Sequence, residues 1–163
     1  MDTLATQVGA LLKSHGLMLA TAESCTGGGV AQAITDVAGS SAWFECGFVT
    51  YSNLSKQQLL GVREATLKQQ GAVSEMTVRE MVAGALQHSV AQVALAVSGV
   101  AGPGGGTAEK PVGTVWFAWG IKDKPCVVQL HHFSGNRAEI RAQAVNISLQ
   151  GIINLLNKST KTA

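Results

Sequence analysis

Two glycine-rich turns are the first features of the sequence that could support chemistry. One covers residues 24–29 and reads Ser-Cys-Thr-Gly-Gly-Gly, and the other covers residues 99–106 and holds five glycines. Backbone N–H groups in such turns can approach an anion closely, and a helix that follows adds partial positive charge. Neither turn has the Gly-Lys-Ser/Thr of a Walker A loop or the spacing of a dinucleotide fingerprint. The need for a tight turn would by itself explain the glycines of one such loop. Two such loops, each after a strand that is predicted to be buried and parallel, indicate a ligand site.

Ser24 is a candidate nucleophile because it lies where a predicted strand turns into a predicted helix. The N–H groups of Cys25, Thr26 and Gly27 are candidate donors to an oxyanion at this turn. Helix capping is the commoner role of a serine at such a position, so spacing leaves both roles open. Cys25 is a rival nucleophile, since a helix N-terminus lowers a thiol pKa, although a cysteine beside a strand is more often simply packed.

A nucleophilic serine needs a base, and the histidines are poorly placed for that role. Two of them end predicted helices and two are consecutive in a strand, where they face opposite sides: His15, His88, His131 and His132. Two adjacent histidines alone are a weak metal signal, so no metal site is predicted. A buried lysine with a lowered pKa is the remaining option. Lys56 is the best placed, although spacing alone favours an ordinary solvated lysine.

Arg137 and Arg141 lie four residues apart at the start of the last predicted helix and therefore share a face. Two guanidinium groups on one face suit a phosphate or a carboxylate. A surface pair with Glu139 or its neighbours is the competing interpretation, and spacing favours it.

Hydrophobic periodicity predicts the elements that must position these side chains. Short apolar runs predict strands at residues 17–22, 44–51, 92–98, 113–121 and 126–133. Helical spacing predicts helices at residues 3–14, 30–37, 53–60, 74–88 and from 136 onward. The four residues 122–125 are short enough for an antiparallel hairpin. We therefore expect an α/β fold, a three-layer α/β/α sandwich with a mixed sheet, whose strand order the sequence leaves open.

Composition narrows the class of protein further. The 163 residues are 46% hydrophobic and 13% charged, with a net charge of +2 and no basic patch outside residues 158–161. This predicts a globular protein without electrostatic nucleic-acid binding. No apolar run is long enough for a membrane helix, and no secretory signal begins the chain. Three unpatterned cysteines, at Cys25, Cys46 and Cys126, predict reduced thiols and a cytoplasmic location.

Six ordered segments resemble the CinA C-terminal-domain family, and the resemblance runs from about residue 3 to about residue 157. The segments are Thr-Ala-Glu-Ser-Cys-Thr-Gly-Gly at 21–28, Gly-Phe-Val-Thr-Tyr-Ser-Asn at 47–53 with Lys56, Gly-Ala-Val-Ser at 71–74, Ser-Gly-Val-Ala-Gly-Pro at 98–103 with Gly-Gly-Thr at 105–107, Lys-Pro-Val-Gly-Thr-Val at 110–115, and Phe-Ser-Gly-Asn-Arg at 133–137. We therefore expect one amidohydrolase domain over residues 1–163, with a frayed tail at residues 158–163.

The resemblance implies an enzyme of pyridine-nucleotide salvage that needs neither a metal nor an organic cofactor. Its expected reaction is hydrolysis of the carboxamide of nicotinamide mononucleotide, which gives nicotinate mononucleotide and ammonia. The resemblance assigns the serine, lysine and tyrosine of the chemistry to Ser24, Lys56 and Tyr51. The residues expected to contact the substrate are Ser74, Gly102, Gly105, Thr107, Arg137 and Arg141, with Glu75 as a further candidate.

Two further expectations accompany the resemblance. The family usually has an acidic residue where this chain has Asn136, and asparagine can equally cap the last helix and present Arg137. A homodimer is expected, with no nucleic-acid or membrane partner. A nucleotide-binding module of the same fold, without catalysis, is the alternative function, since fold membership does not guarantee activity.

Overall fold

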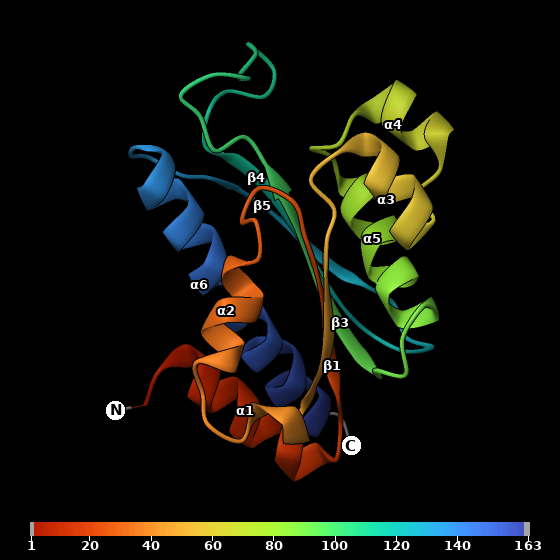
Figure 1. Ribbon diagram of the computed structural model, residues 1–163, viewed down its shortest axis with the longest axis vertical. Helices are drawn as coiled ribbons and strands as arrows, with labels where there is room; N and C mark the ends of the chain where they lie inside the picture. The colour runs from red at the N-terminus through yellow and green to blue at the C-terminus, as the bar shows by residue number, and fades with distance from the viewer. Residues whose placement is uncertain (1, 162–163) are drawn as a thin grey trace.

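A five-stranded mixed sheet forms the centre of the computed structural model, which describes residues 2–161 (Figure 1). The strand order is β2-β1-β3-β4-β5. Strand β1 pairs in parallel with β2 on one side and with β3 on the other, whereas β3, β4 and β5 are joined antiparallel. The strands are β1 (Leu19–Glu23), β2 (Phe44–Val49), β3 (Val93–Gly99), β4 (Thr114–Ile121) and β5 (Val127–His132).

Helices cover both faces of this sheet, so the three-layer sandwich expected from the sequence is confirmed (Figure 1). One face carries α1 (Leu4–His15), α2 (Gly29–Thr35) and α6 (Arg137–Lys161). The other carries α3 (Asn53–Leu60), α4 (Glu64–Gln70) and α5 (Glu75–Gln87). A separate apolar core fills each interface, as expected when a central sheet is buried on both sides.

Strand β1 is wholly buried because it lies between two parallel neighbours and beneath helices on both faces. Its side chains alternate between the cores: Leu19 packs with the α1, α2 and α6 side, and Ala20 and Ala22 pack with the α5 side. Helix α6 packs closely on β4, where Gly151 leaves room for the Trp119 ring. The central strands are thus a rigid support for whatever follows their carboxyl ends.

The expected strands are all present, with ends shifted by at most two residues. Two elements were not predicted: the 3-10 turn η1 (Ser40–Ala42) and helix α4, seven residues long, which has no side-chain cap at Arg63. Helix α6 continues through Lys161, into the segment expected to be frayed, and residues 162–163 lie outside the described part of the chain. Between residues 2 and 161 no helix has the length and apolarity needed to cross a bilayer.

The fold brings both glycine-rich turns to one edge of the sheet. Because β1 and β3 are parallel neighbours, their carboxyl ends lie side by side, and each leads directly into one of the turns. The start of α6 and the long loop after β3 lie at this same end of the molecule (Figure 1). Ligands of open α/β sheets bind at such an edge.

Candidate active site

Ser24 is the first residue after β1 and is almost fully buried, with 8% of its surface exposed. Its N–H donates to the carbonyl of Val97 on β3 at 3.0 Å, so the sheet fixes its backbone. Gly27 and Gly28 then adopt positive φ angles of 59° and 96°, which glycine reaches without strain. The chain thereby turns sharply from β1 into α2 and leaves Ser24 at the bend.

Glu23 holds this turn, and the sequence motifs did not single it out as a site residue. Its fully buried carboxylate accepts hydrogen bonds from the Thr26 hydroxyl at 2.5 Å, the Val30 N–H at 2.9 Å and the Ala31 N–H at 3.0 Å. These donors belong to the turn and to the first residues of α2, where a carboxylate also complements the helix dipole. A glutamate directly after an otherwise uncharged, mostly apolar strand was the available signal.

Lys56 lies directly against Ser24. Its Nζ donates to Ser24 Oγ at 2.9 Å and to the Thr50 carbonyl at 2.7 Å. The Ser52–Ser55 capping box starts α3 and turns the Lys56 side chain inward, where only 1% of the residue is exposed. This burial lowers the Lys56 pKa from 10.5 to about 8, because desolvation disfavours the ammonium form. The solvated lysine that spacing favoured is therefore wrong.

Cys25 is buried beside this pair, and burial raises the pKa of its thiol to about 11. A helix N-terminus would lower the thiol pKa, but desolvation of the thiolate raises it, and desolvation is the larger effect here. Cys25 is thus a protonated, packed thiol at neutral pH. Of the two rival nucleophiles, only Ser24 has a base within hydrogen-bond distance among the described residues.

A cavity of about 270 Å³ opens in front of Ser24 and Lys56. Its walls come from the turn after β1, the start of α3, the segment before α5, the loop after β3 and the first residue of α6. The sequence predicted part of this lining: Ser24, Cys25, Tyr51, Lys56, Gly102, Gly105 and Arg137. It missed another part: Asn53, Ala72, Val73 and Ser98. Ser98, the one polar residue that ends the apolar run of β3, had a recognisable signal.

Arg137 joins the two sides of the cavity. One guanidinium nitrogen donates to the Gly102 carbonyl at 2.7 Å, and another donates to the Tyr51 hydroxyl at 3.0 Å. Asn136 caps α6 by accepting from the Glu139 N–H at 2.9 Å, and the Glu139 carboxylate accepts in return from the Asn136 N–H. Asparagine therefore presents Arg137 as predicted, and Glu139 is engaged by the cap. The surface pair between Arg137 and Glu139 is not found among the described residues.

Tyr51 is exposed, unlike Ser24 and Lys56: 63% of its surface is accessible to solvent. Its one hydrogen bond among the described residues goes to Arg137, and none goes to Lys56. The structure thus places Tyr51 at the mouth of the cavity, beside the arginine, and not between Ser24 and Lys56.

Arg141 lies behind the turn and does not line the cavity. Its Nε donates to the Cys25 carbonyl and a terminal nitrogen donates to the Thr26 carbonyl, both at 3.1 Å. Gly27 also departs from expectation, because its N–H donates to the Ser24 carbonyl at 3.0 Å and is not free to bind an oxyanion. Of the expected donors, the Cys25 and Thr26 N–H groups have no oxygen acceptor within residues 2–161.

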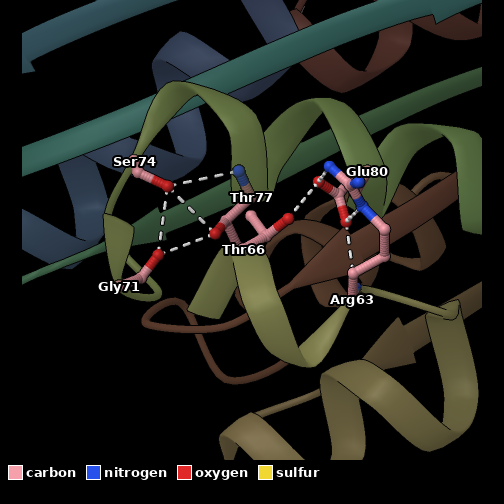
Figure 2. Close-up of polar contacts among 6 residues, drawn as sticks. All are labelled: Arg63, Thr66, Gly71, Ser74, Thr77 and Glu80. Carbon is pink, nitrogen blue, oxygen red and sulfur yellow. Dashed lines mark hydrogen bonds and ion pairs between the residues drawn. The ribbon is translucent and has the colours of Figure 1, made fainter. Parts of the chain in front are cut away.

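Two further residues expected to contact the substrate make hydrogen bonds within their own segments of the chain. Ser74 caps α5: its hydroxyl accepts from the Thr77 N–H and donates to the Gly71 carbonyl (Figure 2). Thr107 closes its own loop, with its hydroxyl accepting from the Lys110 N–H at 3.0 Å. Neither lines the cavity. Glu75 pairs with Arg79 on the surface of α5.

Within residues 2–161 no group of three or more His, Cys, Asp or Glu side chains converges to hold a metal ion. The arrangement of a buried amine, a serine hydroxyl and unengaged backbone N–H groups suits acyl transfer at a serine.

Comparisons with known proteins place the chain in one family. Residues 1–156 match the model of the CinA C-terminal domain. The chain is 57% identical over 150 residues to the nicotinamide-nucleotide amidohydrolase PncC of Enterobacter agglomerans, covering 92% of each chain. It is 56% identical to the PncC of Escherichia coli K12 over 90% of its own length and 89% of that relative. The crystal structure of the competence/damage inducible protein CihA from Agrobacterium tumefaciens superposes with a TM-score of 0.91 at 46% identity, covering 94% and 93% of the two chains. The chain therefore belongs to the CinA C-terminal domain family.

Proposed function

We propose that this protein is a nicotinamide-nucleotide amidase, which converts nicotinamide mononucleotide and water to nicotinate mononucleotide and ammonia in pyridine-nucleotide salvage. Relatives named for this activity match nearly the whole chain. The observation that carries the mechanism is the buried contact of 2.9 Å between Lys56 Nζ and Ser24 Oγ, at the floor of the cavity.

In the first half of the reaction, neutral Lys56 takes the proton of Ser24 as Oγ attacks the carboxamide carbon. The carbonyl oxygen becomes an oxyanion beside the N–H groups of Cys25 and Thr26. The Lys56 ammonium then gives its proton to the departing nitrogen. The C–N bond breaks, ammonia leaves and the nicotinoyl group stays on Ser24 as an ester.

In the second half, Lys56 acts as base toward a water molecule, which attacks the ester carbon and releases the carboxylate product. The pKa of about 8 suits this role, because about a tenth of Lys56 is neutral at pH 7 and the ammonium remains a good acid. The Thr50 carbonyl holds Nζ in place during both halves, since it accepts a hydrogen bond from either protonation state.

Arg137 is the proposed ligand of the 5′-phosphate. Its hydrogen-bond partners, the Gly102 carbonyl and the Tyr51 hydroxyl, are both neutral, so its positive charge is not matched by a carboxylate among the described residues. A planar guanidinium at the cavity mouth can bind two phosphate oxygens at once. In this assignment Tyr51 orients the arginine, and the glycines of the loop after β3 allow the substrate to approach the backbone.

Activity is tested by incubating the purified protein with nicotinamide mononucleotide and measuring ammonia and nicotinate mononucleotide. Ser24→Ala and Lys56→Ala should each abolish turnover, whereas Cys25→Ser, the matched control, should retain it. Binding of the nucleotide by calorimetry without any product, at high enzyme concentration, would instead favour the binding module without catalysis.

We further propose that the enzyme is a cytoplasmic homodimer. Its three cysteines are free thiols, as expected in a reducing compartment. Four exposed apolar side chains lie on β2, on α3 and between them, and offer a surface for a second subunit: Val49, Tyr51, Leu54 and Leu59. Sedimentation equilibrium of the wild type and of Leu54→Glu tests the assembly; a wild type that sediments as a monomer contradicts it.

A further inference from the structure

Arg141 makes an unusual pair of contacts behind the nucleophile. Its guanidinium donates to two consecutive peptide carbonyls of the turn, those of Cys25 and Thr26, both at 3.1 Å. The approach is close because residue 27 is a glycine, at which an added Cβ would lie 3.3 Å from the Arg141 nitrogen. Within residues 2–161 no carboxylate forms an ion pair with Arg141. Its charge therefore acts on the peptide groups of the turn.

Each of these carbonyls connects Arg141 to an N–H group beside Ser24. The Cys25 carbonyl belongs to the same planar peptide as the Thr26 N–H, which points in the opposite direction. The Thr26 carbonyl shares its peptide with the Gly27 N–H, which donates to the Ser24 carbonyl at 3.0 Å, and that carbonyl shares its peptide with the Cys25 N–H. Two chains of polarised peptides thus begin at the guanidinium and end at the Thr26 and Cys25 N–H groups.

These two N–H groups are the ones that have no oxygen acceptor among the described residues. A cation at the carbonyl end of a peptide draws electron density from its N–H, and consecutive hydrogen bonds reinforce the effect. Both chain ends lie one and two residues after Ser24, whose Oγ contacts Lys56. The donors expected to stabilise an oxyanion are therefore oriented and strengthened by one side chain that does not line the cavity.

We infer that Arg141 is a positioning residue that orients and polarises the Cys25 and Thr26 N–H groups for the oxyanion, and that it does not bind the substrate phosphate. This inference rests on the proposed serine mechanism. It separates two arginines that lie on one helix: Arg137 acts on the substrate, and Arg141 acts through the backbone of the turn.

The test compares Arg141→Gln with Arg141→Lys, because glutamine keeps one hydrogen bond without the charge and lysine keeps the charge. For Arg141→Gln we expect kcat to fall about 10- to 100-fold, part of the effect of losing an oxyanion donor, with KM unchanged. Arg141→Lys should recover much of the loss. Arg137→Gln is the control, in which KM should rise. Thermal unfolding of each variant establishes that it is folded.

A second readout makes the inference independent of the natural substrate. A fluorophosphonate reacts with an activated serine: the Ser24 hydroxyl proton passes to Lys56, a bond forms between Oγ and phosphorus, the P–F bond breaks and fluoride leaves, and the phosphonyl oxygen occupies the oxyanion position. Arg141→Gln should slow this labelling of Ser24, followed by intact mass, by the same factor as kcat. If the wild type is labelled but leaves nicotinamide mononucleotide intact, the proposed substrate is wrong while the inference is still tested.

Three results would overturn the inference. Arg141→Gln could raise KM at unchanged kcat, as expected of a phosphate ligand. The Arg141→Gln and Arg141→Lys variants could keep equal activity, which would show that the hydrogen bond of residue 141, and not its charge, supports catalysis. Labelling of Ser24 in Arg141→Gln could proceed at the wild-type rate. If Arg141→Gln does not fold, the labelling rate of Arg141→Lys decides the question. Lysine reaches only one of the two carbonyls, so labelling slower than in the wild type supports the inference. Labelling at the wild-type rate contradicts it.

Discussion

Replacing Lys56 with methionine should abolish turnover without lowering stability at neutral pH. Methionine keeps the buried stem of the side chain and removes the amine. Burial lowers the Lys56 pKa from 10.5 to about 8, and each pKa unit corresponds to about 1.4 kcal/mol, so the folded state disfavours the ammonium by about 3 kcal/mol at pH 7. The substitution relieves this cost. It also removes the hydrogen bonds to Ser24 and Thr50, worth about 1 kcal/mol each.

The sharper expectation concerns how the stability difference changes with pH. The unfolded chain binds a proton at Lys56 that the folded chain has released between pH 8 and pH 10.5, so wild-type stability rises with pH in this window. The methionine side chain of the Lys56→Met variant has no proton to release. The stability of the variant relative to the wild type should therefore fall by about 2.5 kcal/mol between pH 7 and pH 10, so that its net advantage of about 1 kcal/mol at pH 7 becomes a deficit at pH 10.

Urea unfolding of both proteins at pH 7, 8, 9 and 10 measures this difference, and groups that titrate equally in both proteins cancel. Lys13→Met, on the exposed face of α1, controls for the loss of an amine as such. A stability difference between Lys56→Met and the wild type that stays constant from pH 7 to pH 10 would refute the reasoning. Lys56 would then keep its ordinary pKa and could not act as a base at neutral pH.

Single contacts support three other predictions. The logarithm of kcat/KM should rise with unit slope to about pH 8 and then level off, because Lys56 must be neutral to act; a flat profile from pH 6 to 8.5 would contradict this. Thr21→Val should stabilise the fold by about 1 kcal/mol in urea unfolding, because Thr21 Oγ1 is the one buried side-chain oxygen or nitrogen without a partner among the described residues; Thr21→Ser, which keeps the hydroxyl, should give no gain. Arg137→Met should raise KM for the mononucleotide about 10- to 100-fold, since a hydrogen-bonded charge is lost, and leave turnover of the nucleoside, which lacks the phosphate, unchanged; equal effects on both substrates would remove the phosphate assignment.

The strands were predictable from the sequence because their signal is local. The apolar run of β3 and the short connection from β4 to β5 each identify an element without reference to the rest of the chain. Helix α4 was missed because it is short and Arg63 provides no side-chain cap. The order of the strands depends on which edges pair, and no local pattern records that choice.

Site residues were predictable where a single segment contains the whole signal. They were not predictable where the site forms by contact between distant segments. The turn after β1 made Ser24 a candidate nucleophile without reference to any other segment, with Cys25 as its rival. Lys56 has no local mark of burial, since its neighbours Ser55 and Gln57 are polar and its amine is enclosed by Ser24 and Thr50 from other parts of the chain. Spacing therefore favoured the wrong environment, and only the family resemblance assigned the lysine to the site. Ser74 is a related case: a serine before a helix caps it whether or not a site lies nearby, and Ser74 caps α5 without lining the cavity.

The two arginines of α6 connect the fold to the chemistry most directly. A spacing of four residues puts them on one face of the helix, and this suggested a single anion site. The turn after β1 and the loop after β3 instead meet different parts of that face: the loop offers Gly102 to Arg137, and the turn offers Cys25 and Thr26 to Arg141. One helix therefore supplies positive charge both at the mouth of the cavity and behind the nucleophile. A shift of α6 along the sheet would displace both charges together, and would therefore move the proposed phosphate ligand and the proposed oxyanion donors at the same time.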